Sequence, residues 1–371
     1  MGLLIIGTGS YVGTGATLTV SVSQLIGVTP QLVITARDAN AANTAAHCWK
    51  CSTMGAAQSI AGFQSLLTTG ITALGSGSFT VGTSTAANNS GDTYYYVAIA
   101  EVEDDGGPEA SPAILEVGSY TGNGADDRNI SYQSITSPDF LWVRRLVNND
   151  EDVWRFAAGP AGDNSALRPS DAFSSADFIQ AMNATSFQVG TTTGVNNSGD
   201  TYVYVALKVK VGVLATGTYD GNDTDGRDIV QSDVFQPQVV LVKANNAVGS
   251  PVIKTDFMPI GDSSLVLEDF SQDIPSGVSG LDTDLIQAIN ADGFEVGSGN
   301  GDGVLTNDSA GAAPDVPYFW LTFRGENLPA AVGTVISGDT GFGGFALPTT
   351  PYALFKSILD IHKRYTNVRI R

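Results

Sequence analysis

The chain has 371 residues, 42% of them hydrophobic, which is enough apolar material for several packed cores. Its formal net charge is −20, and so acidic a body repels nucleic acid and anionic membranes. No segment approaches the roughly 18 consecutive apolar residues of a membrane span, and the start of the chain lacks the basic region and long apolar core of a secretory signal.

The chain repeats one set of landmarks three times. Each copy opens with Gly-Ser-Tyr or Gly-Thr-Tyr, at residues 9–11, 118–120 and 217–219. A proline followed by an apolar run comes next, starting at Pro30, Pro138 and Pro237. Phe-x-Val-Gly follows, at 79–82, 187–190 and 294–297. An aromatic run closes each copy, at 94–98, 202–206 and 318–321.

The landmarks keep their order in all three copies, so the repeat is real. A period near one hundred residues exceeds the roughly 20–50 residues of a solenoid unit and matches a whole small domain copied in tandem. We predict domains at 1–102, 112–210 and 211–323, and a C-terminal docking tail at 324–371. The run Asp-Asp-Gly-Gly-Pro at 104–108 is the clearest linker.

Each unit is predicted to be a β domain. Forty-three glycines, short apolar runs between turn signals, and alternation at 17–22 and 202–207 favour strands. Two segments, 171–179 and 282–289, are predicted to form short helices. The predicted fold is mainly β: three tandem β-sandwich or jelly-roll-like domains with a short helical or extended tail.

His47-Cys48-Trp49-Lys50-Cys51 contains the only two cysteines of the chain. A Cys-x-x-Cys pair can be a redox couple or half of a zinc site, but closed zinc sites need four ligands. Three interpretations remain: a structural role, which we favour, a local disulfide, or a metal site completed by other residues.

The acidic loop of the third unit offers hard oxygen ligands on a flexible backbone, which suits calcium. Its candidate ligands are Asp220, Asp223, Asp225 and Asp228. The loop lacks the full calcium-binding pattern, so solvated β-turns are the alternative. Calcium is the one cofactor that the sequence suggests.

The aromatic runs allow two interpretations. Alternate rings would face outward and stack on a sugar, or they would fill the core, which is the commoner arrangement in a sandwich. The candidate stacking residues are Tyr94, Tyr96, Tyr202, Tyr204 and Trp320.

The end of the chain is basic although the body is acidic. Five cations gather there: Lys356, Lys363, Arg364, Arg369 and Arg371. They would dock on an acidic neighbour, or they would complement the dipole of a helix at 351–363.

Catalytic constellations are scarce. His47 and His362 are the only histidines, and neither lies in a nucleophile–base motif. No phosphate-binding glycine-rich loop precedes a helix pattern, and no pair of carboxylates stands out. The sequence therefore predicts a protein that is not an enzyme.

Parts of the chain resemble tandem modules of tailed-phage virion proteins, which occur in tail-associated and fibre-like components. The resemblance lies in the segments 217–222, 235–243 and 196–204, covers about 112–323, and extends more loosely to 1–102. The first unit departs most, because it lacks counterparts of the Gly-Asn turn at 221–222 and of Lys243, which ends the segment 235–243. The motifs prescribe no catalytic residue.

The resemblance implies a structural protein of a phage particle, at the tail, the collar or the capsid surface. Its partners would be other virion subunits and further copies of itself, with neither nucleic acid nor membrane bound. The alternative is a receptor-binding or glycan-binding adhesion protein that meets a host surface glycan.

Overall fold

A computed structural model describes residues 2–38, 47–56, 58–61, 65–102, 113–147, 152–159, 166–168, 177–245, 250–259, 261–267, 281–298, 305–308 and 316–326. Within these ranges the chain is mainly β, as predicted, and its strands pair into antiparallel sheets. They form three copies of one pattern, which we call repeats 1, 2 and 3.

Repeat 1 contains a large and a small sheet. The large sheet has the order β1-β9-β3-β4-β5-β6, with β1 (Leu3–Val12), β9 (Thr93–Val102), β3 (Leu32–Asp38), β4 (His47–Cys51), β5 (Ser59–Ala61) and β6 (Ser65–Leu67). The small sheet has the order β2-β8-β7, with β2 (Leu18–Ser21), β8 (Ser78–Val81) and β7 (Ile71–Gly75). Two short helices, η1 (Ser23–Leu25) and α1 (Thr85–Asn88), complete the repeat.

Repeat 2 keeps the same plan. Its large sheet is β10-β16-β12-β13, with β10 (Leu115–Thr121), β16 (Thr201–Leu207), β12 (Phe140–Arg145) and β13 (Asp152–Phe156). Its small sheet is β11-β15-β14, with β11 (Arg128–Ser131), β15 (Ser186–Val189) and β14 (Ile179–Met182). The helix α2 (Thr193–Asn196) occupies the place of α1.

Repeat 3 has the longer form of the large sheet. Its order is β17-β25-β19-β20-β21-β22, with β17 (Leu214–Asp220), β25 (Pro317–Phe323), β19 (Val239–Ala244), β20 (Val252–Thr255), β21 (Ser263–Val266) and β22 (Leu281–Thr283). Its small sheet is β18-β24-β23, with β18 (Arg227–Val230), β24 (Gly293–Val296) and β23 (Ile286–Asn290).

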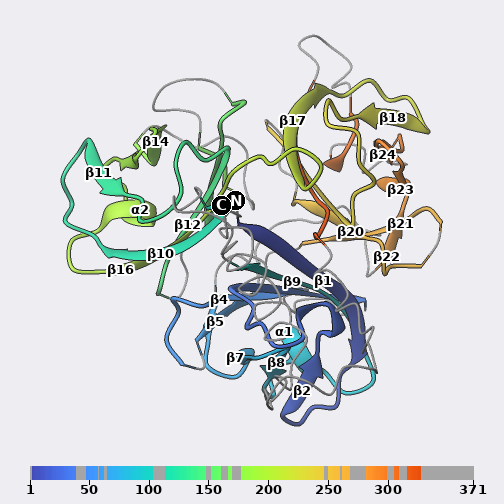
Figure 1. The fold of residues 1–371 in the computed structure, drawn as a ribbon, viewed down its shortest axis with the longest axis horizontal. Coiled ribbons are helices and arrows are strands. Elements are labelled where there is room, and N and C mark those ends of the chain that lie inside the picture. The colour runs from blue at the N-terminus through green and yellow to red at the C-terminus, as the bar shows by residue number, and fades with distance from the viewer. Residues whose placement is uncertain are drawn as a thin grey trace, which may run out of the picture.

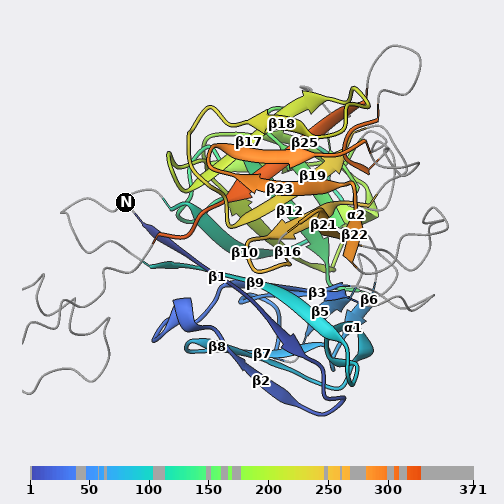
Figure 2. The same cartoon turned by 90° about the vertical axis from the view of Figure 1, so that its right-hand side faces the viewer.

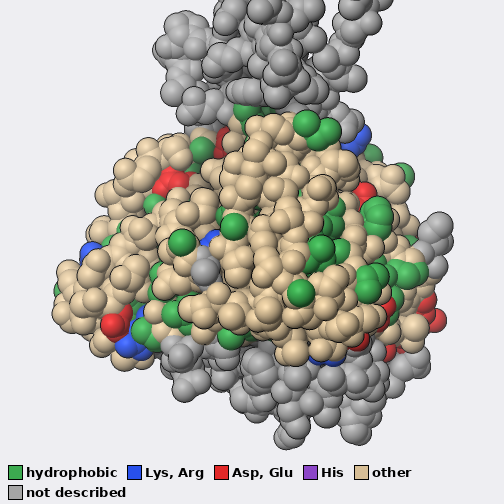
Figure 3. Space-filling view, turned by 90° about the horizontal axis from the view of Figure 1, so that it is seen from below, with side chains coloured by type: hydrophobic (Ala, Val, Ile, Leu, Met, Phe, Trp, Pro, Cys, Tyr) green, Lys and Arg blue, Asp and Glu red, His purple; other side chains and the backbone are tan. Residues whose placement is uncertain are grey.

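The three repeats surround a common centre (Figures 1 and 2). The large sheets face inward and the small sheets lie outside, so repeat 1 presents β2, β7 and β8 on the lower side of Figure 1. Figure 3 shows that side directly. The sandwich-like sheet pairs are confirmed. The three units do not have fully separate cores, because all three large sheets contribute residues to one shared cluster, which we call the central core.

The aromatic strands are buried on both faces, which explains their sequence. In β9, Tyr94 and Tyr96 pack into the core of repeat 1, whereas Tyr95 and Val97 pack into the central core. Successive side chains of a strand point to opposite faces, so a strand between two cores needs apolar residues at every position. The strands β16 and β25 follow the same rule, except that β25 contains the buried Thr322, whose hydroxyl donates to Gln231.

The prediction of a helix at 282–289 is wrong. That segment forms the end of β22 and most of β23, and a bulge shifts the pairing of β23 with β24 between Ile286 and Ala288. The bulge disturbs the period-2 pattern, so the apolar spacing imitates a helix. In the second predicted helix, 171–179, residues 171–176 lie outside the described residues; Ile179 begins strand β14.

A buried asparagine fixes the equivalent turn in each repeat. Asn88, Asn196 and Asn307 are all fully buried. In repeat 2, the Asn196 Oδ1 accepts the amide N–H of Asn123 at 3.0 Å, and its Nδ2 donates to the carbonyls of Ala125 and Gly190. The side chain therefore holds the loop after the first strand against the loop before the aromatic strand.

A tyrosine pair closes each repeat beside this asparagine. Tyr120 of the Gly-Ser-Tyr landmark stacks on Tyr202 of the aromatic strand, with ring centroids 5.0 Å apart. Both hydroxyls donate to carbonyls of α2, those of Val195 and Thr193. Repeats 1 and 3 contain the matching stacked pairs, at 5.1 Å each.

The glycine of this landmark is required by close packing. A β-carbon on Gly118 would overlap with the ring of Tyr204. Gly9 and Gly217 face the equivalent rings, so a larger side chain at any of the three would displace an aromatic residue of the core. The most recognisable residues of the repeat thus serve the fold.

We expect the substitution Asn196→Ala to lower the free energy of unfolding by about 2–4 kcal/mol, because it leaves several buried main-chain groups without their partner. Urea unfolding followed by tryptophan fluorescence measures this loss. The control Asn129→Ala alters an exposed position of β11 and should change the free energy by less than about 0.5 kcal/mol. Equal effects of the two variants would contradict the assigned role.

Candidate functional site

The junction between repeats 1 and 2 combines a contact between aromatic rings with buried polar contacts. Trp49 of β4 and Trp142 of β12 meet with ring centroids 4.1 Å apart. The Trp49 indole N–H donates to Asp152 Oδ2 at 3.1 Å. Asp152 also forms an ion pair with Arg144 at 3.6 Å, and both side chains are fully buried. Burial makes this pairing specific, since either charge alone would be costly.

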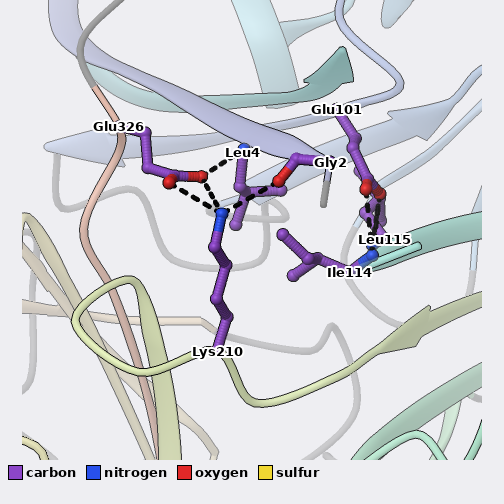
Figure 4. A network of polar contacts seen from close by, with 7 residues as sticks. All are labelled: Gly2, Leu4, Glu101, Ile114, Leu115, Lys210 and Glu326. Carbon is purple, nitrogen blue, oxygen red and sulfur yellow. Dashed lines mark hydrogen bonds and ion pairs between the residues drawn. The ribbon is translucent and has the colours of Figure 1, made fainter. Parts of the chain in front are cut away.

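A second junction joins the start of the chain to the end of repeat 3 (Figure 4). The Lys210 ammonium contacts both carboxylate oxygens of Glu326, at 2.7 and 2.6 Å, and donates to the carbonyl of Gly2. Glu326 also accepts the amide N–H of Leu4 at 2.9 Å. One lysine–glutamate pair therefore connects the segment between repeats 2 and 3 to both β1 and the residues after β25.

Glu101 connects repeats 1 and 2 near this pair (Figure 4). Its carboxylate accepts the amide N–H groups of Ile114 and Leu115, where β10 begins. Burial raises the pKa of Glu101, while the two amides and Lys210 act in the opposite direction. The carboxylate satisfies main-chain donors that the β10–β16 pairing does not use.

Two of the junctions run in the same direction around the molecule. The Thr53 hydroxyl after β4 donates to the carbonyl of Gly118 in repeat 2, at 3.2 Å. In the equivalent place after β20, Asp256 accepts the hydroxyl of Thr8 in repeat 1, at 2.6 Å. Each of these loops thus reaches the first strand of the following repeat, and repeat 3 is followed by repeat 1.

Repeat 3 contains a groove of about 830 Å³ at one end of its sandwich. Amide and charged side chains line it together with an apolar floor that includes Phe235 and Met258. The polar side chains are Gln236, Gln238, Lys254, Thr255, Asp256, Gln287 and Arg324. A smaller recess of about 410 Å³ adjoins it, shares Gln287 and Ala288, and adds the acids Asp225, Asp262 and Glu295.

A buried lysine forms part of the groove wall. The Lys254 ammonium donates to the carbonyls of Gly261 and Ser263, the first at 2.9 Å. Burial lowers the pKa of Lys254 to about 8, and Asp262 opposes the shift. The hydroxyl of Thr255, another lining residue that is only 2% exposed, has no hydrogen-bond partner among the described residues.

This lysine has counterparts that sequence reasoning missed. The strand register places Lys50 and Arg155 at the same position of β4 and β13. Both donate to main-chain carbonyls: Lys50 to that of Gly55 in a loop, and Arg155 to that of Ile179, where β14 begins. The sequence does contain a sign of these equivalent cations, since a basic residue directly follows Trp49, Trp154 and Ile253. Sequence reasoning did not find it because a cation inside an apolar strand is normally unfavourable, and here main-chain carbonyls compensate the charge.

The two cysteines are free and buried. Cys48 packs in the core of repeat 1 and Cys51 in the central core, so they lie on opposite faces of β4 and do not face one another. Burial raises the pKa of Cys48 to about 11. Both side chains act as small apolar core residues, which is the structural interpretation.

The four candidate calcium ligands lie in and beside a loop at the surface of repeat 3. Asp220, Asp223, Asp225 and Asp228 are all exposed. The Asp225 carboxylate accepts Gln287 Nε2 and the Asp228 carboxylate accepts Asn290 Nδ2, each at 2.7 Å, so both point to the small sheet. In the described part of the chain, no three His, Cys, Asp or Glu side chains gather as metal ligands would.

The proposed stacking rings are core residues instead. Tyr94, Tyr96, Tyr202, Tyr204 and Trp320 are at most 6% exposed. Burial and a hydrogen bond to Glu116 raise the pKa of Tyr204, so this hydroxyl stays a donor. These rings present no platform to a sugar, because the small sheets cover one face of the strand and the central core the other.

The basic residues predicted as assembly contacts, Lys356, Lys363, Arg364, Arg369 and Arg371, lie outside the described residues. No family model matches the chain, and no curated protein is similar to it. Among the described segments, no helix is both long and apolar enough to cross a membrane.

We expect Glu326→Ala to speed hydrogen exchange at the Leu4 amide and to cost about 1–3 kcal/mol of stability, because it removes that amide's acceptor and the partner of Lys210. Exchange measured by mass spectrometry on N-terminal peptides reports the first effect. Glu295→Ala is the matched control, since it removes a carboxylate from β24 in the same repeat. Unchanged exchange near Leu4 in Glu326→Ala would refute the role of this pair.

Proposed function

We propose that the chain is a non-enzymatic structural subunit of a bacteriophage particle, located at the tail, the collar or the capsid surface. The observation that carries this proposal is that the repeated residues have structural roles. The glycines, tyrosines and asparagines that recur in every repeat hold its sheets and loops together. The resemblance to tandem modules of virion proteins points in the same direction.

The central core supports the same role. Aromatic residues from different repeats meet there, such as Phe156 of β13 and Phe319 of β25, which stack with centroids 5.0 Å apart. Three sheet pairs joined by such contacts form one body that resists deformation, because packed interiors are barely compressible. A subunit that transmits load to its neighbours in a particle requires that property.

Mass spectrometry of purified particles from the phage that encodes the chain tests this proposal. The expected result is a fixed copy number per particle that fits a symmetric ring or lattice. Recovery of the chain only outside assembled particles would overturn it.

We also propose, as the alternative function, that the protein binds a host surface glycan, and the groove of repeat 3 favours it. Its amide, carboxylate and guanidinium groups supply both donors and acceptors, as sugar hydroxyls require, above an apolar floor. With a net charge of −20, the chain favours a neutral saccharide over a polyanion.

We expect Ala288→Trp to abolish binding on a glycan array, because Ala288 lines both recesses and an indole there would fill them. Ala181 occupies the same register on β14 of repeat 2, so Ala181→Trp is the matched control and should leave binding unchanged. Wild-type protein that binds no neutral glycan, or equal loss in both variants, would reject the groove as a glycan site.

A further inference from the structure

Charge is distributed very unevenly among the repeats. Of the 56 Lys, Arg, Asp and Glu residues in the chain, only five fall within residues 1–102. They are Arg37, Asp38, Lys50, Asp92 and Glu101. Residues 1–36 and 51–91 contain no such residue, although the whole chain carries a net charge of −20.

These five charged groups have partners within the large sheet or at junctions. Arg37 and Asp92 form an ion pair at 2.5 Å, and Lys50 is 4% exposed and bound to loop carbonyls. Glu101 accepts amides of repeat 2, and Asp38 accepts an amide at the start of β22 in repeat 3. The small sheet of repeat 1 therefore has no charged side chain of its own.

The sister repeats show that this is a property of repeat 1 and is not imposed by the fold. In the small sheet of repeat 1, Thr19 of β2 pairs with Thr80 of β8. The same register positions in repeat 3 hold Asp228 and Glu295. The scaffold thus accommodates two carboxylates at the positions where repeat 1 has two threonines.

One further position distinguishes repeat 1 from both sister repeats. Leu18 begins β2 where repeats 2 and 3 have Arg128 and Arg227. Repeat 2 carries the neutral amides Asn129 and Gln188 at the threonine positions. Repeat 1 is the only one of the three whose small-sheet strands contain no charged residue at all.

The outer face of this small sheet is correspondingly uncharged (Figure 3). In that view most of the surface is uncharged polar or main-chain material with hydrophobic side chains among it. Charged side chains are few, and most of them lie toward the margins. The Thr19 and Thr80 hydroxyls hydrogen-bond to each other at 3.2 Å, so removing them from water costs fewer hydrogen bonds to solvent. Ile26, beside the β7–β8 turn, is 54% exposed.

We propose that this face, formed by β2, β8 and β7, is where a second copy of the chain docks, through a twofold contact of the face with itself. Two bodies of charge −20 repel each other wherever acidic surfaces meet. A face without charges avoids that repulsion and costs little to desolvate, and protein interfaces are depleted of charge at their centre. A twofold contact uses one self-complementary surface, as most homodimers do.

The proposal does not depend on the protein's place in a particle, because the purified chain tests it. The double variant Thr19→Asp/Thr80→Glu introduces the residues that repeat 3 already carries at these positions, so the fold should tolerate it. The matched control Asn129→Asp/Gln188→Glu makes the same change of charge in repeat 2. Circular dichroism and thermal unfolding verify that both variants are folded.

Sedimentation equilibrium should show a dimer for the wild type and for the repeat 2 control. In Thr19→Asp/Thr80→Glu the dissociation constant should rise at least about tenfold, because four carboxylates would then face one another. A wild-type chain that stays monomeric at about 100 μM, where even a weak dimer would be populated, overturns the proposal. A dimer that weakens equally in both variants, or in neither, also overturns it.

Discussion

The structure depends on one apolar core that no single repeat could complete. Each large sheet buries one face against its own small sheet and the other against the large sheets of its neighbours. Burial of apolar surface is the dominant favourable term in folding, and here much of it is shared. The repeats therefore gain stability from each other, and the polar junctions at Asp152 and Lys210 fix how they meet.

Within this shared framework, each repeat has its own means of fixing the small sheet and its loops. The buried asparagine and the stacked tyrosine pair satisfy main-chain groups near the outer end of the aromatic strand. They recur because unpaired polar groups are expensive wherever they are buried. The residues that differ between repeats lie elsewhere: in the groove wall of repeat 3, and at the paired threonines Thr19 and Thr80 of repeat 1.

The sequence alone was sufficient for the β class and for the repeating order of landmarks, because alternation and turn residues are local signals. It was not sufficient for the burial of Tyr94 and Tyr202, since a strand covered on both faces and a strand with an outward aromatic row look alike. The bulge in β23 imitated a helix. The groove could not be foreseen, because its wall joins Gln236, Lys254 and Gln287, which only the fold brings together.

The covalent connection of the repeats has an evolutionary consequence. In a trimer of identical chains, every substitution appears three times, so a surface cannot change on one side only. Here the three positions represented by Thr19, Asn129 and Asp228 belong to one gene but can mutate separately. Fusion therefore keeps the mechanical advantage of a three-sided body while each side is free to acquire a different neighbour.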